Sequence, residues 1–433
     1  MHDHSGGCNR RTSFSAATLF LLTLPVAFAA CRLRIETSPG APIDAAETVP
    51  AETACAVHEV NVVAHFDDDL LFMNPAIDNA IDSSHCVRTV YLTAGDAGLE
   101  SSYVVEREAG VRAAYAVMAA VPDEWARADL TVGGRTVRSL TLTHARQVTL
   151  SFLNLPDGID GRGSDRYGHV SLGRLWRGVA SDLTTIDGAT RYDRQSVIDV
   201  LSDILLHDRA DIVRTLDRTG VWGRDHSDHR NSARFAVAAF ERSGLQAVHT
   251  SYRGYNIDEL IPNLDEAAVH AKWEAFAAYV AHDPALANGH DPVVSTLYVS
   301  WAARQYPLTA RETEANAFID SSGRCLSATA DEPSAAELRV VECGDGLRQA
   351  WLFTDDGQLR NEGRCVTARG DLAFPDTPVL GTACKHVPPQ HWKLTPEHHI
   401  IAMGRCLASH RDGTMPELAE CSNAPEQVWR AAR

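Results

Sequence analysis

The last part of the chain carries one short sequence pattern three times. Each copy opens with Gly-Arg-Cys, at Gly323, Gly363 and Gly404, so that the copies begin 40 and 41 residues apart. Each copy then contains a second cysteine and closes with Gln-x-Trp, at Gln349–Trp351, Gln390–Trp392 and Gln427–Trp429. Threefold repetition at this period, without a helical pattern, predicts an all-β architecture made of three similar units of short strands.

This repeated segment, residues 316–433, resembles the ricin B-type lectin domain. The resemblance implies a β-trefoil fold that binds carbohydrate, and a glycan polymer is the partner that we expect for it. In sugar-binding repeats of that family an aspartate usually follows soon after the first cysteine, whereas the residues two positions past each cysteine are here Ser327, Thr367 and Ala408. The usual galactose contacts are therefore missing, and a trefoil that serves only as a stable docking domain is the alternative.

Residues 55–307 have a different pattern, in which short apolar runs alternate with amphipathic segments. Residues 60–64 and 86–93 are typical of strands, and residues 194–209 and 229–242 have helical spacing. This alternation predicts a Rossmann-like α/β domain, with a mostly parallel sheet and helices on both faces. Ligands of such folds bind at the carboxyl ends of the strands.

Two clusters of polar residues follow predicted strands of this domain. The first contains His65, Asp67 and Asp68, and the second contains His226 and His229. A catalytic zinc ion takes three protein ligands and keeps one position for water. His65 and Asp68 are close enough to bind one ion, and His229 can complete the set. Iron(II) accepts the same ligand types, but Asp67 remains free as a base and favours hydrolysis.

Both clusters are similar to motifs of the PIG-L/LmbE-like N-deacetylases. Ala64-His65-Phe66-Asp67-Asp68-Asp69 resembles the family's A-H-P-D-D-E motif, and the second cluster resembles its H-x-x-H motif. The similarity includes residues 92–98 and 155–158 and extends over about residues 58–280. The family uses zinc to remove N-acetyl groups from amino-sugar conjugates. The resemblance therefore implies a metal-dependent N-deacetylase whose substrate is an N-acetylated sugar or glycoconjugate.

The resemblance also implies roles for the residues of the two clusters. One Zn²⁺ per chain would be bound by His65, Asp68 and His229. Asp67 would be the general base that accepts a proton from the attacking water. His226 would stabilise the oxyanion and protonate the leaving amine.

Four more positions bear on this assignment. Arg107 and Asp157 would lie on the substrate side of the site. Two residues depart from the family's pattern, since Phe66 replaces a proline and Asp69 replaces a glutamate. Because Asp69 is one methylene shorter, any hydrogen bond from it to a metal ligand would have to be re-aimed. Neither departure removes a ligand or the base, so we expect activity.

The first 31 residues have the pattern of an export signal. The basic pair Arg10–Arg11 precedes an apolar stretch, Phe14–Ala30, that ends in small residues. Cys31 follows in a context that resembles the lipobox of bacterial lipoproteins, with Phe28 where leucine is preferred; ordinary cleavage that leaves Cys31 unmatched is the alternative. Residues 32–54 suit a flexible tether. We expect an exported protein, either extracellular or a lipoprotein of a bacterial envelope that reaches the membrane through its lipid.

Eight cysteines follow Cys31. An even number in an exported chain favours disulfides over metal binding. Each repeat holds two cysteines at similar offsets, and the remaining two precede predicted strands. We therefore predict the pairs Cys55–Cys86, Cys325–Cys343, Cys365–Cys384 and Cys406–Cys421. The formal net charge of −17 argues against a nucleic-acid partner, which would favour a basic surface.

Together these patterns predict an exported, zinc-dependent hydrolase. It would remove N-acetyl groups from an amino-sugar-containing substrate and carry a carbohydrate-binding module. One alternative is a glycan-binding protein whose α/β domain is inactive. Another is an amidase that acts on a non-sugar amide.

Overall fold

The computed structural model describes residues 55–288, 291–292, 295–309, 312–329, 335–344, 347–368, 377–410 and 415–432. The predicted export signal (residues 1–31), with the lipobox cysteine Cys31, and the predicted tether (residues 32–54) lie outside these ranges. Within them, no helix has both the length and the apolar content of a membrane span.

The first described region contains a mostly parallel sheet, as the alternating pattern predicts. Five strands are parallel, in the order β10-β9-β1-β2-β6. Their bounds are β1 (His58–Val63), β2 (Cys86–Thr93), β6 (Val148–Leu155), β9 (Ile212–Leu216) and β10 (Val248–Tyr252). An antiparallel edge extends the sheet beyond β6, with β5 (Arg135–Leu142), β3 (Trp125–Arg127) and β4 (Leu130–Val132).

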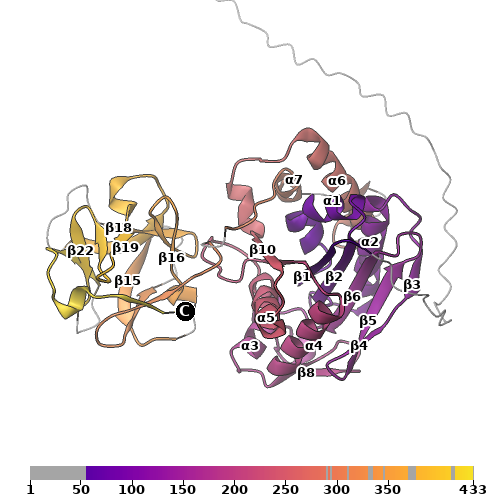
Figure 1. Cartoon of the computed structure of the whole chain (residues 1–433), viewed down its shortest axis with the longest axis horizontal. Coiled ribbons are helices and arrows are strands. Elements are labelled where there is room, and N and C mark those ends of the chain that lie inside the picture. Colours follow the sequence, from indigo (N-terminus) through magenta and orange to yellow (C-terminus); the bar gives the residue numbers. More distant parts are fainter. Residues whose placement is uncertain are drawn as a thin grey trace, which may run out of the picture. The chain divides into compact units, whose positions relative to one another are not determined.

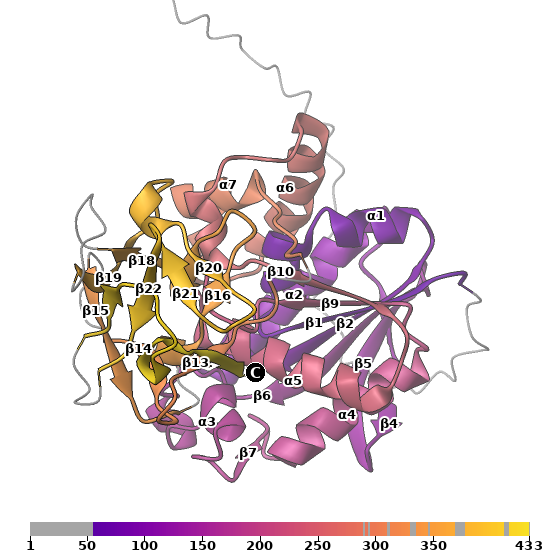
Figure 2. The same cartoon turned by 60° about the vertical axis from the view of Figure 1, so that its left-hand side comes forward.

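Helices cover both faces of this sheet (Figures 1 and 2). One face carries α1 (Ala76–Asp82), α2 (Ser101–Met118), α6 (Glu266–Val280) and α7 (Thr296–Ala302). The other carries α3 (Leu172–Trp176), α4 (Arg194–His207) and α5 (Ser227–Ser243). Two small hairpins, β7 (Asp182–Thr184) with β8 (Arg191–Asp193) and β11 (Ala287–Asn288) with β12 (Asp291–Pro292), lie outside the main sheet.

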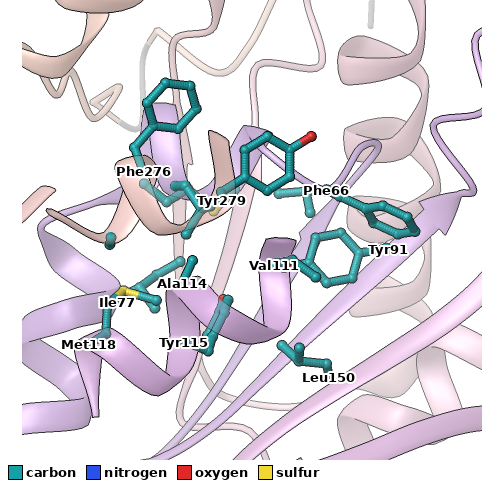
Figure 3. Packing of buried hydrophobic residues seen from close by; sticks show 14 of the residues in the cluster. Phe66, Ile77, Tyr91, Val111, Ala114, Tyr115, Met118, Leu150, Phe276 and Tyr279 are labelled. Carbon is teal, nitrogen blue, oxygen red and sulfur yellow. The ribbon is translucent and has the colours of Figure 1, made fainter. Parts of the chain in front are cut away.

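The alternation of side chains along the strands divides the core into two layers. On β1, Val60 and Val62 pack under α4 and α5, while Val63 faces the layer of α2 and α6. In the α2–α6 layer, Phe66 lies beside Tyr91, and Val111 and Tyr115 of α2 face the sheet (Figure 3). A strand that is apolar on both faces is what a sheet covered by helices on both sides requires.

The C-terminal region is all-β, as its repeat predicts. Its strands pair only antiparallel among the described residues. They are β13 (Ala317–Ile319), β14 (Cys325–Ala328), β15 (Ala335–Val341), β16 (Leu352–Phe353), β17 (Leu359–Asn361), β18 (Arg364–Ala368), β19 (Thr377–Ala383), β20 (Lys393–Leu394), β21 (Ile400–Ala402), β22 (Arg405–Ala408), β23 (Glu417–Ala419) and β24 (Arg430–Ala432).

The Gln-x-Trp signature has the same structural role in each repeat. The buried indole N–H of the tryptophan donates to the carbonyl that follows the first cysteine: Trp351 to Leu326 (2.9 Å), Trp392 to Val366 (2.6 Å) and Trp429 to Leu407 (2.9 Å). Each glutamine amide also donates to a backbone carbonyl seven residues earlier. The glutamine and tryptophan that recur in each repeat are therefore the residues whose hydrogen bonds satisfy buried polar groups around a shared core.

Disulfides join the four pairs of cysteines that the sequence predicts. Cys55–Cys86 links the start of the described chain to β2, and one bridge lies within each repeat, at Cys325–Cys343, Cys365–Cys384 and Cys406–Cys421. The three repeat bridges close loops of 15 to 19 residues.

Candidate active site

The topology of the sheet brings both polar clusters to one place. The chain runs outward from β1 through β2 to β6, then returns to β9, which lies on the other side of β1. This reversal of strand order is a topological switch point, where the loops at the carboxyl ends diverge and leave a crevice. The first cluster follows β1, and the second follows β9 at the start of α5. The structure thus places His65, Asp67, Asp68, His226 and His229 together.

Asp68 organises the loop after β1. Its Oδ2 accepts hydrogen bonds from the backbone N–H groups of Ala64 (3.1 Å) and His65 (2.7 Å). Its Oδ1 lies 3.3 Å from Nδ1 of His65 and 2.8 Å from Nε2 of His229. One carboxylate therefore connects the two clusters, which come from opposite sides of the switch point.

The start of α5 sets the orientation of both later histidines. His226 caps the helix, because its Nδ1 accepts from the backbone N–H of Asp228 (3.2 Å). The proton of a neutral His226 ring is consequently on Nε2. His229 has the opposite arrangement, since its Nδ1 lies 2.8 Å from Oδ1 of Asp225 and donates to that carboxylate. Loss of the proton from Nε2, which lies 2.8 Å from Oδ1 of Asp68, would then leave a lone pair for a metal ion, as in many carboxylate-oriented metal-binding histidines.

The site has the donor atoms for a metal ion. Nε2 of His65 is buried and has no hydrogen-bond partner among the described residues, and the buried Nε2 of His229 lies 2.8 Å from Oδ1 of Asp68. Ligand atoms of His65, His226 and His229 lie within 4.8 Å of one another, and so do those of His65, Asp157 and Asp228. Buried polar atoms without a partner are costly, and two imidazoles with a carboxylate match the ligands of a catalytic zinc. The residues therefore fit a bound metal.

Charges within the site shift the pKa values of His229 and His226 in opposite directions. Burial lowers the pKa of His229, but Asp68 and Asp225 more than offset this effect and raise the pKa to about 10. Burial raises the pKa of Asp68, but His229 and His65 hold that pKa well below its usual value. His226 differs, because burial and the neighbouring His65 lower its pKa to about 4. His226 is therefore neutral at pH 7 and can donate one N–H.

The two residues expected on the substrate side also lie here. Arg107 is buried and donates from Nη2 to Oδ1 of Asp67 (2.9 Å). Asp157 lies beside the first cluster, with Oδ2 3.7 Å from Nε2 of His65. Its backbone N–H donates to Oδ1 of Asp96 (2.8 Å) in the loop after β2. Burial raises the pKa of Asp67, and the Arg107 guanidinium opposes that shift.

The two residues that depart from the family's motif face away from the ligands. Phe66 is fully buried and packs edge-on against Tyr91, with ring centroids 5.2 Å apart. Asp69 is fully buried and accepts hydrogen bonds from the hydroxyls of Tyr91 (2.8 Å) and Tyr115 (2.7 Å). Both tyrosines of the core thus bind Oδ2 of the shorter side chain, whereas its buried Oδ1 has no hydrogen-bond partner among the described residues.

Sequence reasoning missed several residues of the site. Asp225 precedes His229 by four residues, a spacing at which a side chain can reach the first turn of the helix, so this contact had a local signal. Tyr255 packs edge-on against His229 at 4.8 Å, and Tyr279 and Asp283 contact Arg107. These three come from a region without a recognisable motif, and only the fold brings them to the site.

Family models match both regions of the chain. The PIG-L model, described as GlcNAc-PI de-N-acetylase, matches residues 60–240. The model described as ricin-type beta-trefoil lectin domain matches residues 316–429. Among curated proteins, "Ribosome-inactivating protein SNAI'" of Sambucus nigra is 26% identical over 93 residues, which are 21% of this chain. The chain spans only 14% of the length of that relative.

Solved structures similar to this chain include three lectins. The agglutinin from Abrus precatorius is 19% identical, with a TM-score of 0.26, over 29% of this chain and 50% of that chain. The C-half of the earthworm R-type lectin in complex with GalNAc is 12% identical, with a TM-score of 0.24, over 27% and 97%. The Vibrio vulnificus hemolysin/cytolysin beta-trefoil lectin with N-acetyl-D-lactosamine bound is 14% identical, with a TM-score of 0.24, over 27% and 92%.

Proposed function

We propose that this chain, which joins a PIG-L-family domain to a ricin B-type lectin domain, is an exported zinc-dependent hydrolase that removes N-acetyl groups from an amino-sugar-containing substrate. The catalytic domain would extend over residues 55–307 and the lectin domain over residues 316–433. The observation that carries the proposal is the buried cluster of His65, Asp68 and His229, in which Oδ1 of Asp68 lies 3.3 Å from Nδ1 of His65 and 2.8 Å from Nε2 of His229. Asp67, whose Oδ1 accepts from Nη2 of Arg107 (2.9 Å), directly precedes Asp68 in the chain.

The proposed metal site consists of His65, Asp68 and His229, with one zinc ion per chain. When bound, zinc would act as a Lewis acid toward the amide oxygen and lower the pKa of water. Two other groups compete with this set: His65 with His226 and His229, in which Nδ1 of His226 already accepts from the backbone N–H of Asp228, and His65 with Asp157 and Asp228. However, Oδ2 of Asp228 already accepts from the backbone N–H of Gly158 (2.6 Å), which makes this carboxylate a support for the loop after β6.

Asp67 and His226 would handle the protons of the reaction. Because Arg107 holds Oδ1 of Asp67, Oδ2 is the oxygen that would accept the proton of the attacking water. The Nε2–H of His226 would donate to the oxyanion that forms on the amide carbonyl. His226 would give its Nε2 proton to the leaving amine, and the proton that Asp67 took from water would return to Nε2, so that the site ends in its starting protonation state. Asp157 and the outer edge of Arg107 would contact the substrate.

The lectin domain would hold the enzyme on a glycan polymer. Four disulfides in the described ranges support a location outside the reducing cytosol. We propose an extracellular protein or a lipoprotein of a bacterial envelope, with residues 1–31 as the export signal, residues 32–54 as a tether and lipid at Cys31.

Acetate release from a panel of N-acetyl sugars, measured with the zinc-loaded full chain, tests the function. His229→Ala should lose zinc and activity together, because a three-ligand site does not tolerate the loss of one ligand. His207→Ala is the matched control, since that side chain is half exposed and lies at the end of α4. Retained zinc in His229→Ala would remove this residue from the ligand set. Turnover of non-sugar amides alone would favour a general amidase, and glycan binding without any turnover would favour an inactive α/β domain.

A further inference from the structure

A buried polar network ties Arg107 to the helix layer above the site. The guanidinium donates in three directions: Nη2 to Asp67 Oδ1 (2.9 Å), Nη1 to the Gly95 carbonyl (2.6 Å) and Nε to the Tyr279 hydroxyl (2.6 Å). The Tyr279 hydroxyl in turn donates to Oδ2 of Asp283 (2.6 Å), and that oxygen also lies 3.1 Å from Nε of Arg107. Arg107, Tyr279 and Asp283 are all buried.

We propose that Tyr279 and Asp283 are positioning residues of the hydrolytic site, which act through Arg107 to hold Asp67 with Oδ1 occupied and Oδ2 free for the water proton. This inference rests on the proposed function, in which Asp67 is the general base. Tyr279 lies on α6 and Asp283 follows that helix, so both are outside residues 60–240, which match the PIG-L family model.

Charge balance explains why two acids surround one guanidinium. A buried ion that loses its partner keeps the full cost of its desolvation. With Asp283 on one side and Asp67 on the other, the Arg107 charge is shared between two carboxylates. The planar fork of arginine also fixes directions, because its N–H groups cannot rotate independently. Anchoring Nε at Tyr279 and Asp283 therefore determines where Nη2 points, and Nη2 determines the rotamer of Asp67.

Two glycines preserve the space that this network needs. A Cβ on Gly95 would lie 2.5 Å from Nη1 of Arg107, and Gly95 has a φ of +55°. A Cβ on Gly110 of α2 would lie 2.7 Å from the backbone oxygen of Tyr279 and 2.9 Å from its ring. Gly110 lets α2 approach α6 closely, which puts the Tyr279 hydroxyl within reach of Arg107; Figure 3 shows Tyr279 over the α2 layer. Side chains are absent at the two points where they would displace the network.

The test uses the zinc-loaded full chain with N-acetylglucosamine as the probe. In Tyr279→Phe we expect kcat to fall about tenfold, and in Asp283→Asn by up to about a hundredfold, because small misplacements of a reacting group have effects of this size. Zinc content should stay within about twofold of the wild-type value, and KM should change less than kcat, since neither residue itself contacts substrate or metal. Tyr192→Phe, a buried tyrosine in the core on the other face of the sheet, is the control for general packing.

A double-mutant cycle separates positioning from a structural role. Adding Tyr279→Phe to Asp67→Asn should lower the residual kcat by less than about twofold, because the residue acts only through Asp67. An equal tenfold loss in both backgrounds would overturn the proposal, and so would wild-type kcat in both single variants.

Crystal structures distinguish a failure of the positioning role of Tyr279 and Asp283 from a failure of the proposed function. In the wild-type protein Asp67 Oδ1 should contact Arg107, and in Asp283→Asn the Asp67 carboxylate should rotate. An unchanged Asp67 rotamer would overturn the positioning role even if the chain deacetylates no sugar. Conversely, a rotated Asp67 in a chain without deacetylase activity would leave the positioning role standing and remove the proposed function.

Discussion

The two regions of this molecule satisfy their buried polar groups over very different distances in sequence. In the trefoil, each tryptophan indole donates to a carbonyl 22 to 26 residues earlier, and each repeat closes its own disulfide. In the α/β domain, Arg107 joins Asp67, 40 residues before it, to Tyr279, 172 residues after it. The first region repeats one local solution three times. The second has a single network assembled by the fold.

This difference predicts how each region responds to damage. Loss of a bond in one repeat leaves the equivalent bonds of the other two repeats in place. The residues of the site have no such duplicates. If His65, Asp68 or His229 is lost, no equivalent residue takes its place. Substitutions in the α/β domain should therefore change chemistry strongly, whereas substitutions in the trefoil should change stability or localisation.

Among variants that keep the metal, the largest effect should come from Asp67→Asn. The amide cannot accept the proton of the attacking water, so we expect a loss of ~10²–10⁴-fold in kcat, the usual contribution of a general base. Zinc content and the thermal transition should remain close to those of the wild type, because the isosteric amide can still accept from Nη2 of Arg107. Acetate release and metal analysis measure both. Near wild-type turnover would transfer the role of base to another group.

Those residues of the site that have metal-binding or acid–base side chains and follow a parallel strand could be predicted from the sequence. His65, Asp67 and Asp68 follow β1 directly, and His226 and His229 follow β9 at the start of α5, so parallel strands alone bring them to one edge. The trefoil was predictable for another reason. The Gln-x-Trp motif recurs because each repeat needs the same hydrogen bonds from its tryptophan indole and its glutamine amide.

The surroundings of the other residues of the site depend on tertiary packing that no local sequence pattern indicates. Asp69 was expected to adjust a hydrogen bond toward a metal ligand, but Tyr91 and Tyr115 face it from β2 and α2. Tyr279 lies on α6, whose sequence is equally typical of ordinary helix packing, and Asp283 follows that helix. Their contact with Arg107 follows from the close approach of α2 and α6 at Gly110, a tertiary feature with no local pattern.

A somewhat smaller effect should appear in the pH dependence of the same domain's stability. Burial raises the pKa of Asp69 to about 7, whereas the unfolded chain has an aspartate pKa of about 3.9. The folded protein therefore holds a proton that the unfolded chain releases, and the stability from this group is lost as the pH rises from about 4 to about 7. Three pKa units correspond to about 4 kcal/mol.

The experiment compares urea unfolding of the metal-free wild type with Asp69→Asn at several pH values. The stability of the wild type relative to the variant should decline across this window, because asparagine cannot ionise but can still accept from both tyrosines. Asp160→Asn, an exposed position, is the control. A constant difference between wild type and Asp69→Asn would show that Asp69 is ionised throughout the window.

In the trefoil, removal of one bridge should cost stability without a change in chemistry. Replacing Cys406 and Cys421 by serine opens a loop of 15 residues, which the chain-entropy estimate values at ~3 kcal/mol. We expect a lower unfolding transition for the trefoil, while zinc content and turnover of N-acetylglucosamine stay unchanged. Differential scanning calorimetry and acetate release measure the two. If this variant loses turnover of N-acetylglucosamine at a temperature where its trefoil is still folded, the chemistry of the α/β domain depends on the trefoil and the prediction is wrong.

The smallest effect on chemistry should follow from deletion of the whole trefoil. The shortened chain should end after Thr309, because Leu308 donates from its backbone N–H to the Ser251 carbonyl (2.7 Å) and the Tyr306 carbonyl accepts from Arg253 (3.0 Å), bonds that hold the last segment against β10. This chain retains His65, Asp67, Asp68, His226 and His229, and we expect it to deacetylate N-acetylglucosamine at the rate of the full chain.

A polymeric N-acetylated glycan should reveal the difference between the two forms. If the trefoil binds that polymer, tethering raises the local substrate concentration, and the shortened chain should be slower by a factor that disappears when excess isolated trefoil competes. Ser327, Thr367 and Ala408 occupy the positions where sugar-binding repeats usually carry aspartate, so any binding must use other side chains. If the full and the shortened chain have equal rates on both substrates, and the full chain retains no glycan, the trefoil serves only as a docking domain. The enzyme then reaches its substrate by free diffusion.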